Sequence, residues 1–373
     1  MKFLLNIDKV FQELLLQEDT DQDKKITKDD NGPKKFVLVD ETTKQEEVIV
    51  GTYHLSNLLQ ELAQLKEANS TLGEVDLSRI QENPVQRISR KIKDDYWEEL
   101  TRTIDKKGLT RIVEDEKTSS DVATLYVAAK DKQGVAYFQA LVQELPNFKV
   151  EILPENYSVE YVETLNDKPG ILALALEQKI YSLQGVPFVV PGGRFNEMYG
   201  WDSYFIGVGL LIDGQIGKAI AIAENFKYQI IHYGKILNAN RSYYLTRTQP
   251  PLYSSLLIEI AKKGMPSLEW LRSHLETVIL EYSTLWLFQR NKLTPTGLNR
   301  YKADGIGMPF EVEPGHFDDV LEPYAKKYNL PIREFEKQYL QRTLIDDELD
   351  IYFVHDRSMR ESGRDTTNRL INT

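Results

Sequence analysis

Residues 191–204, PGGRFNEMYGWDSY, combine residue types that packing alone does not explain. Two adjacent glycines, Gly192 and Gly193, allow positive φ angles and the close approach of another molecule. Charged and aromatic side chains follow, namely Arg194, Phe195, Glu197, Tyr199, Trp201, Asp202 and Tyr204. Aromatic rings stack on the C–H face of a sugar, whereas guanidinium and carboxylate groups bind its hydroxyls in pairs. The stretch therefore predicts a sugar site; the alternative is a turn that begins a buried helix.

Residues 238–251, NANRSYYLTRTQPP, form a second loop that is dense in hydrogen-bonding side chains. Amide, guanidinium and hydroxyl groups of this kind donate to and accept from sugar hydroxyls. The loop predicts a second set of sugar contacts, and the alternative is a helix cap followed by a surface turn.

Residues 19–30, DTDQDKKITKDD, have the ligand spacing of an EF-hand calcium loop. The expected Ca²⁺ ligands are Asp19, Asp21, Asp23, Asp30 and the backbone carbonyl of Lys25. Alternate carboxylates of this kind converge on one hard cation. The loop departs from the usual pattern because Lys24 replaces a glycine, position 12 is an aspartate, and residues 31–33 stop any exit helix. The alternative is a solvated acidic turn.

The composition predicts a globular cytoplasmic protein that binds neither nucleic acid nor membranes. Of the 373 residues, 41% are hydrophobic, which is enough for one large or two smaller cores. The net charge of −11 would repel a polyanion, and the absence of cysteine excludes disulfides and thiolate chemistry. The apolar run at residues 3–5 is too short for a signal peptide, and no stretch approaches the ~20 apolar residues of a membrane span.

Hydrophobic periodicity predicts a small N-terminal domain at 1–82 and a mainly helical domain at 83–373. In the first we expect a helix at 3–17, strands at 36–39 and 48–50, and a helix at 55–65. In the second we expect a strand at 125–127 and helices at 171–180, 202–213, 215–233, 252–263, 267–288, 316–328 and 331–343. Paired helices with polar loops at their ends are typical of an α/α toroid, although periodicity alone indicates only helices.

The two polar loops resemble consecutive motifs of the trehalase family. Residues 191–204 resemble its signature PGGRFxExYxWDSY, and residues 238–251 are similar to its segment NxNRSYYLxRSQPP. The resemblance runs through nearly the whole chain and is closest to the fungal cytosolic neutral enzymes that carry a calcium-binding segment. It implies a mainly α fold: about the first half of an (α/α)6 toroid glycosidase, preceded by a small α+β calcium-binding domain.

Three further segments resemble trehalase loops: GLNRY at 297–301, PFEVE at 309–313 and RESGRD at 360–365. The substrate-binding residues that the resemblance implies are Arg194, Trp201, Asp202, Asn238, Arg247, Thr248, Gln249, Glu311, Arg360 and Gly363. Glu313 is the alternative to Glu311, and Thr248 replaces the usual serine.

Asp365 lies at the position of the family's general acid, which protonates the bridging oxygen as the glycosidic bond breaks. Arg364 replaces the histidine or aromatic residue expected before it, and so close a cation would lower the pKa of Asp365.

The resemblance implies inverting hydrolysis of α,α-trehalose to two glucose molecules, in trehalose catabolism. Inversion needs a second carboxylate, acting as base, at ~6.5–9.5 Å from the acid. In the family this glutamate lies beyond a second signature, QWDxPxGWxP, and neither occurs in the sequence, so we expect the chain to be inactive alone. The partners implied are trehalose, 14-3-3 proteins or a second copy of the chain. The alternatives are a non-catalytic calcium- or sugar-binding fragment that regulates or pairs with a full-length trehalase, and another α/α-toroid glycosidase.

Overall fold

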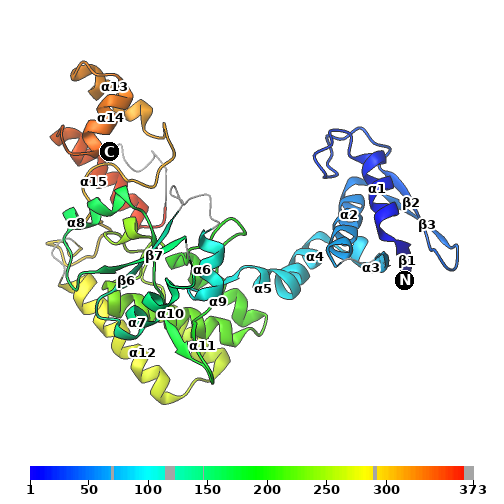
Figure 1. Ribbon diagram of the computed structural model, residues 1–373, viewed down its shortest axis with the longest axis horizontal. Coiled ribbons are helices and arrows are strands. Elements are labelled where there is room, and N and C mark those ends of the chain that lie inside the picture. The colour runs from blue at the N-terminus through cyan, green and yellow to red at the C-terminus, as the bar shows by residue number, and fades with distance from the viewer. Residues whose placement is uncertain (69–70, 114–121, 146, 289–291, 365–373) are drawn as a thin grey trace. The chain divides into compact units, whose positions relative to one another are not determined.

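The computed structural model describes residues 1–373 except 69–70, 114–121, 146, 289–291 and 365–373. The chain divides into two compact units, Met1–Tyr96 and Trp97–Thr373, which are described separately (Figure 1). Residues 83–96 belong to the first unit, and the domain division after residue 82 remains a prediction. Among the described residues, no helix has the length and apolar character that crossing a membrane requires.

The first unit is a small α+β structure with two antiparallel strand pairs. Its elements in chain order are β1 (Lys2–Asn6), α1 (Ile7–Glu18), β2 (Lys35–Val39), β3 (Glu46–Val50), α2 (Thr52–Glu67), β4 (Leu72–Asp76), α3 (Leu77–Ile80), α4 (Pro84–Lys91) and the π-helical turn η1 (Ile92–Tyr96). β1 pairs with β4, and β2 pairs with β3. The strands predicted at 36–39 and 48–50 and the helix predicted at 55–65 are confirmed.

The helix predicted at 3–17 is wrong in its first turn, which forms β1 instead. Phe3 and Leu5 are buried on one face of β1; β4 pairs with one edge of this strand, and on the other edge Asp40 and Glu41 bind the backbone of Leu4. Asn6 then caps α1, because its side chain accepts a hydrogen bond of 3.1 Å from the backbone N–H of Lys9. A short apolar run fits both a helix and a strand, so the choice depends on a distant partner strand.

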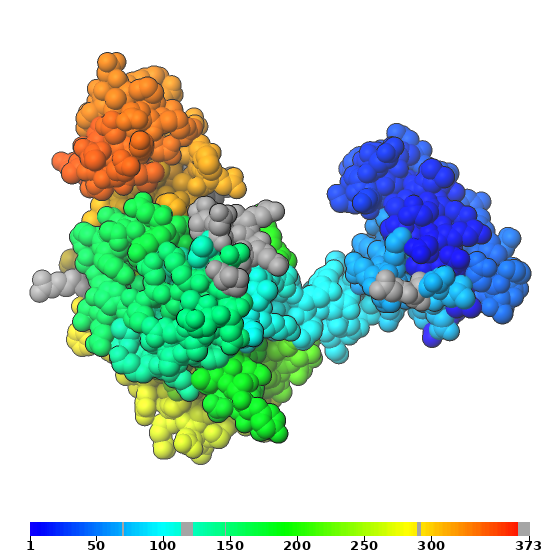
Figure 2. Space-filling view, viewed as in Figure 1, coloured from blue at the N-terminus to red at the C-terminus, as the bar shows by residue number. Residues whose placement is uncertain are grey.

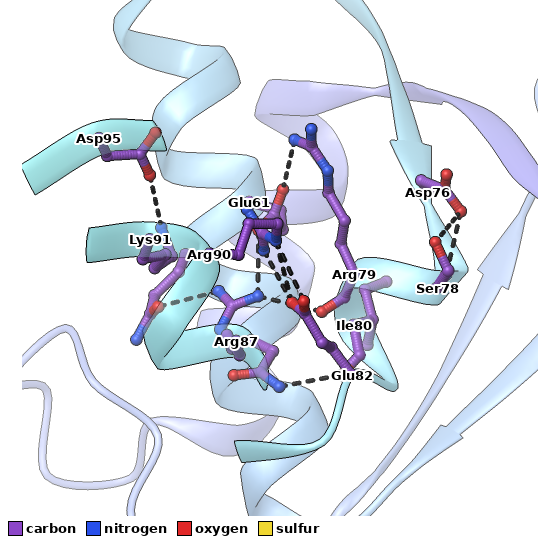
Figure 3. A network of polar contacts seen from close by, with 12 residues as sticks. Glu61, Asp76, Ser78, Arg79, Ile80, Glu82, Arg87, Arg90, Lys91 and Asp95 are labelled. Carbon is purple, nitrogen blue, oxygen red and sulfur yellow. Dashed lines mark hydrogen bonds and ion pairs between the residues drawn. The ribbon is translucent and has the colours of Figure 1, made fainter. Parts of the chain in front are cut away.

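A network of ion pairs fixes α4 against α2 within the first unit (Figure 3). Glu61 on α2 is buried and accepts a hydrogen bond of 3.1 Å from Nη1 of Arg87. The same nitrogen of Arg87 donates to the backbone carbonyl of Arg79 at 3.0 Å. Arg90 donates to both carboxylate oxygens of Glu82, at 2.9 and 3.2 Å. Each of these charges has a partner, which is the condition under which buried ions are tolerated.

The second unit begins with short strands and helices. They are α5 (Trp97–Glu99), β5 (Thr101–Arg102), α6 (Lys106–Val113), β6 (Ala123–Ala128), α7 (Lys132–Leu141), β7 (Phe148–Leu153), α8 (Val159–Thr164), the 3₁₀ turn η2 (Leu165–Asp167), β8 (Ile171–Leu172), β9 (Leu176–Gln178), β10 (Leu183–Gly185) and β11 (Phe188–Val189). β6 is the central strand of a parallel sheet in the order β7-β6-β8, which confirms the strand predicted at 125–127.

The helix predicted at 171–180 is wrong, because this segment forms β8 and β9. Ile171 and Leu172 pair with the centre of β6, and residues 171–174 are fully buried. A continuous apolar run is compatible with a buried strand as well as with a buried helix, so periodicity could not distinguish them.

The remaining elements are mainly helices. They are α9 (Gly200–Ile212), α10 (Ile216–Tyr233), the 3₁₀ turn η3 (Ser242–Tyr244), α11 (Tyr253–Gly264), α12 (Leu268–Glu281), the π-helical turn η4 (Tyr282–Leu287), α13 (Asp318–Lys327), α14 (Ile332–Leu340) and α15 (Asp347–Glu361). The helices predicted from residue 202 onward are confirmed, whereas α15 was not predicted.

Helices α9 to α12 pack against one another and lie together in the green to yellow part of Figure 1. Their facing apolar residues belong to a core that also includes β6 and β11. α13 and α14 pack together with Phe353 of α15 around a separate apolar cluster, and they appear as one orange region in Figure 2. Polar segments between these helices carry five of the ten predicted substrate-binding residues, namely Asn238, Arg247, Thr248, Gln249 and Glu311.

Candidate functional site

Two predicted sugar loops are joined at the N-terminus of α9. The backbone N–H of Gly200 donates to the carbonyl of Asn238 at 3.0 Å. The backbone N–H of Trp201 donates to Oε1 of Gln249 at 2.8 Å. A Cβ atom on Gly200 would lie 2.7 Å from the carbonyl oxygen of Leu237, so the close approach of the loops requires glycine here. The structure thus brings Trp201, Asn238 and Gln249 together.

The C-terminal end of α15 lies against the indole ring of Trp201. Gly363 has a φ of 77°, and a Cβ atom there would lie 2.8 Å from Cε2 of Trp201. Asp202, in the first turn of α9, is partly buried, and burial raises the pKa of its carboxyl group. A carboxyl group with a raised pKa is closer to the form that both donates and accepts hydrogen bonds, which suits a sugar hydroxyl.

Arg247 and Glu311 form an ion pair that links the loop at 238–251 to the predicted loop at 309–313. Nη2 of Arg247 donates to Oε1 of Glu311, and the guanidinium carbon lies 4.7 Å from the ring centroid of Tyr244. Burial raises the pKa of Glu311, but the positive charges of Arg247 and Arg357 lower it by more than burial raises it. The net shift is downward and favours the carboxylate. Glu313, the alternative to Glu311, is exposed.

Thr248 donates hydrogen bonds to a backbone carbonyl and to the side-chain carboxylate of Glu361. Its hydroxyl donates to the carbonyl of Ile236 at 2.8 Å, and its backbone N–H donates to Oε1 of Glu361 at 3.1 Å. The other oxygen of Glu361 accepts a hydrogen bond of 2.7 Å from Nζ of Lys292, and both side chains are 1% exposed. This pair was not predicted, because a charged residue carries no sign of a buried partner far along the chain. The one available signal was the position of Glu361 inside the RESG motif.

A second buried ion pair connects the first two loops. Nε of Arg241 donates to Oε1 of Glu197 at 2.7 Å, and both residues are buried. Beside them in the sequence, Oδ1 of Asn240 accepts a hydrogen bond of 2.7 Å from the backbone N–H of Met198. Glu197, which the sequence pattern grouped with the sugar-binding charges, therefore supports the loops through Arg241.

The side chains of Arg194 and Arg360 contact residues outside the set of predicted sugar-binding residues. Arg194 is exposed, and its guanidinium carbon lies 4.9 Å from the ring centroid of the next residue. Nε of Arg360 donates to Asp356 at 2.7 Å, and Nη2 lies 3.2 Å from Nε2 of His316. The backbone N–H of Gly363 donates to the carbonyl of Arg360 at 3.1 Å, whereas within the described ranges no side-chain hydrogen bond or ion pair joins either arginine to the other predicted sugar-binding residues. Asp365, the predicted acid, lies outside the described residues.

Three carboxylates gather in the predicted calcium loop. One oxygen from each of Asp19, Asp21 and Asp23 lies within 4.8 Å of the others. A hydrogen bond from the Asp23 backbone lowers the pKa of Asp21, but desolvation and repulsion by Asp23 and Asp30 together raise it above its usual value. Lys24 has a φ of 64°, the left-handed conformation that glycine usually supplies at this position. Converging, mutually repelling carboxylates on a loop of this shape fit a divalent cation.

Asp30 ties the two ends of the same loop together. Its Oδ2 accepts a hydrogen bond of 2.7 Å from the backbone N–H of Thr27, and its Oδ1 accepts one of 2.8 Å from Thr20. These backbone hydrogen bonds lower the pKa of Asp30 to about 2. Nζ of Lys25 forms an ion pair of 3.0 Å with Asp23. The roles of Asp30 and of the Lys25 carbonyl as Ca²⁺ ligands remain predictions.

Comparison with known proteins matches nearly the whole chain. Residues 67–373 match the family described as Trehalase, and residues 11–38 match the neutral trehalase Ca²⁺ binding domain. The second match confirms Ca²⁺ as the predicted cofactor.

The cytosolic neutral trehalase of Kluyveromyces lactis is 42% identical over 391 residues, which cover 99% of this chain and 52% of the relative. That of Saccharomyces cerevisiae is 40% identical over 386 residues, covering 99% and 51%. The solved structure of neutral trehalase Nth1 from Saccharomyces cerevisiae aligns with a TM-score of 0.73 at 40% identity, over 77% of this chain and 55% of that chain. The chain spans about half the length of the curated relatives it matches.

Proposed function

Since the chain belongs to the trehalase family, we propose that its protein is a neutral trehalase that hydrolyses α,α-trehalose, with inversion, to two glucose molecules. The observation that carries this proposal is the convergence of Trp201, Gln249 and the Arg247–Glu311 pair from separate loops. The proposed location is the cytosol, which the names of the relatives state for those proteins. The proposed partners beyond trehalose, 14-3-3 proteins or a second copy of the chain, rest on the resemblance alone.

The proposed substrate contacts are of two kinds. Trp201 offers an aromatic ring for the C–H surface of a glucosyl ring; Phe205 meets this indole edge to face, and Gly363 contacts it without a side chain. Arg247 would donate hydrogen bonds to sugar hydroxyls, and the ionised Glu311 would accept hydrogen bonds from them, so together they would fix the orientation of neighbouring hydroxyls. The further proposed contacts come from Arg194, Asp202, Asn238, Thr248, Gln249 and Arg360.

Asp365 is the proposed general acid. It would donate its proton to the bridging oxygen while positive charge develops on the anomeric carbon, so that the first glucose leaves as a neutral molecule. An inverting reaction also requires a carboxylate that activates the attacking water, and we assign no base among the described residues.

Calcium belongs to the first unit in this proposal. Asp19, Asp21 and Asp23 would hold the ion, with Asp30 and the carbonyl of Lys25 as further proposed ligands. The ion would supply the positive charge that balances the acidic loop and keeps it folded.

Glu311→Gln and Glu313→Gln form a matched pair that tests the site. Because the chain spans about half of its relative, the assay uses residues 1–373 continued by the remaining part of the Kluyveromyces lactis enzyme. We expect Glu311→Gln to lower kcat/KM for trehalose ~10–100-fold, since a charged acceptor is lost, whereas the exposed Glu313→Gln leaves it unchanged. Asp365→Asn should lower kcat/KM for trehalose ~10²–10⁴-fold, because the proton donor is lost.

Glucose release is the readout, and circular dichroism checks that each protein is folded. A folded chimera that releases no glucose would overturn the proposed activity. Equal losses in Glu311→Gln and Glu313→Gln would remove Glu311 from the site and leave the activity itself standing.

A further inference from the structure

A cavity of about 260 Å³ lies in the first unit, where it is lined by one face of α2, one face of α4 and Tyr96 of η1. The lining residues of the two helices are Tyr53, Ser56, Asn57 and Gln60 on α2 and Pro84, Arg87, Ile88 and Lys91 on α4. On each helix these positions follow the spacing i, i+3, i+4, i+7, which places them on one side of the helix. None of the described lining residues belongs to the predicted sugar site or to the calcium loop, so a ligand bound here would be independent of the proposed function.

The charged residues among these described lining residues are two cations, and no carboxylate is among them. Arg87 is 4% exposed and Lys91 is 7% exposed. Burying a cation costs free energy unless an anion compensates its charge. Apolar packing of α4 on α2 does not require either charge, so the lining has the electrostatic character of an anion site.

The ion pairs that hold α4 against α2 leave one positive charge in excess (Figure 3). Four cations share three carboxylates in this network, which consists of Arg79, Arg87, Arg90, Lys91, Glu61, Glu82 and Asp95. Among the described residues, Nζ of Lys91 donates one hydrogen bond, of 3.4 Å to Oδ2 of Asp95. That distance exceeds the usual ~2.7–3.2 Å, so the pairing is weak. An ammonium group has three N–H donors, and those of Lys91 are therefore not saturated by Asp95.

Neutral donors complete the lining. Ser56 contributes a hydroxyl group and is half-buried, and Gln60 contributes an amide group and is exposed. Nη2 of Arg87 donates to Oε1 of Gln60 at 3.0 Å, which leaves the amide N–H groups of Gln60 as donors. Ile88, also in the lining, is 60% exposed, so the cavity is open to solvent.

We propose that this cavity binds a small inorganic oxyanion of the size of phosphate. Lys91 and Arg87 would supply charge-assisted hydrogen bonds, and Ser56 and Gln60 would supply neutral ones. The volume lies below the ~300–1,000 Å³ of pockets for larger organic ligands, which suits an ion of few heavy atoms. The bound anion would compensate the excess positive charge between the two helices and stabilise the folded first unit.

Isothermal titration calorimetry of the 373-residue chain with inorganic phosphate tests the proposal. Ionic strength is held constant with NaCl, so that screening does not change during the titration, and no Ca²⁺ is added. We expect saturable binding with a Kd of ~1 mM. Lys91→Met should weaken phosphate binding ~10-fold or more, because a charged donor is lost, and Ser56→Ala should weaken it ~3–10-fold, because a neutral donor is lost. Lys93→Met, at an exposed position two residues further on, is the control and should bind like the unchanged chain.

Asp95→Asn should change the affinity in the opposite direction. Asp95 competes with the anion for Lys91 and repels it, so removing this charge should tighten phosphate binding ~3–10-fold. An ion pair with a purely structural role gives no such gain. Unchanged or weaker phosphate binding in Asp95→Asn would therefore overturn the proposal.

Equal phosphate binding by Lys91→Met and Lys93→Met would also overturn it, as would the absence of saturable binding up to ~50 mM phosphate. Ser56→Ala and Asp95→Asn keep the test decisive if Lys91→Met does not fold. None of these measurements needs turnover of trehalose, so failure of the glucose-release assay would leave their result standing.

Discussion

At the scale of single residues, Glu281 shows what burial does to a carboxyl group for which the described residues supply no ion-pair partner. Burial raises the pKa of Glu281 from 4.5 to about 7. Burial also raises the pKa of Glu311, but Arg247 and Arg357 bring that pKa below its usual value. The difference between the two sites is the neighbouring guanidinium group. Glu281 is thus the group whose protonation should couple to stability near neutral pH.

Replacing Glu281 by glutamine should change how stability depends on pH. The folded chain keeps the Glu281 proton up to about pH 7, whereas the unfolded chain releases it near pH 4.5. The stabilisation that comes from protonated Glu281 is therefore fully present below pH 4.5 and is lost as the pH rises to about 7. The loss amounts to about 3 kcal/mol, and Glu281→Gln lacks it because its side chain does not titrate.

Urea unfolding at pH 5 and pH 8 measures this difference. The free energy of unfolding should fall between the two pH values by about 2.5 kcal/mol more in the unchanged chain than in Glu281→Gln, because part of the loss has already occurred at pH 5. The exposed Glu276→Gln is the control. The same pH dependence in all three proteins would show that Glu281 is solvated and ionised throughout.

The buried Lys292–Glu361 pair makes a prediction of the opposite kind, because here both charges are compensated. Lys292→Met would leave the carboxylate of Glu361 buried, with the Thr248 N–H as its remaining donor among the described residues, at a cost of ~3–5 kcal/mol in the free energy of unfolding. Adding Glu361→Gln removes the stranded charge and should recover much of this loss.

Lys326→Met is the matched control, because its ion pair with Glu322 is exposed. Its cost should stay below ~1 kcal/mol. Urea denaturation of the four proteins gives the comparison. If Lys292→Met cost no more than Lys326→Met, the connection from Lys292 through Glu361 to Thr248 would not stabilise the loop.

At the scale of elements, the calcium loop after α1 depends on charge convergence. Ca²⁺ bound by Asp19, Asp21 and Asp23 should stabilise the folded state by mass action, by ~2.7 kcal/mol at a hundredfold excess over Kd. The melting temperature should therefore rise when Ca²⁺ is added. Asp19→Ala and Asp21→Ala should abolish the rise, since each removes one converging carboxylate.

Asp29→Ala is the control for this loop, because Asp29 is exposed and lies outside the carboxylate cluster. The rise on adding Ca²⁺ is compared, and not the melting temperature itself, because Asp19 also accepts hydrogen bonds from the backbone of Asp23 and Lys24. A rise that persists in Asp19→Ala and Asp21→Ala would assign the ion to other ligands.

At the scale of the whole molecule, the predicted fold class is confirmed. The chain is mainly α, its helices form part of the (α/α)6 toroid of the trehalase family, and a small α+β calcium-binding unit comes before them. α9 to α12 were predictable because their apolar residues repeat at helical spacing over long segments. The assignments of individual site residues remain predictions, which the variants above test.

The sequence by itself determined the long helices, the acidic loop at 19–30 and the motifs around Trp201 and Arg247, because each depends on residues close together in the chain. The resemblance to trehalase motifs named Gln249, and Glu311 with Glu313 as its alternative, before any contact was known, and their roles in sugar binding remain predictions.

Only the tertiary structure decided that the apolar residues at 3–5 and 171–172 are in strands, because pairing with β4 and β6 supplies the backbone hydrogen bonds that a short isolated strand lacks. It also decided that Lys292 meets Glu361, and that Oε1 of Glu281 and Nε1 of Trp286 are buried without a hydrogen-bond partner among the described residues. Burial and charge pairing join residues far apart in the chain, and a sequence pattern records the residue types but not the distances between them.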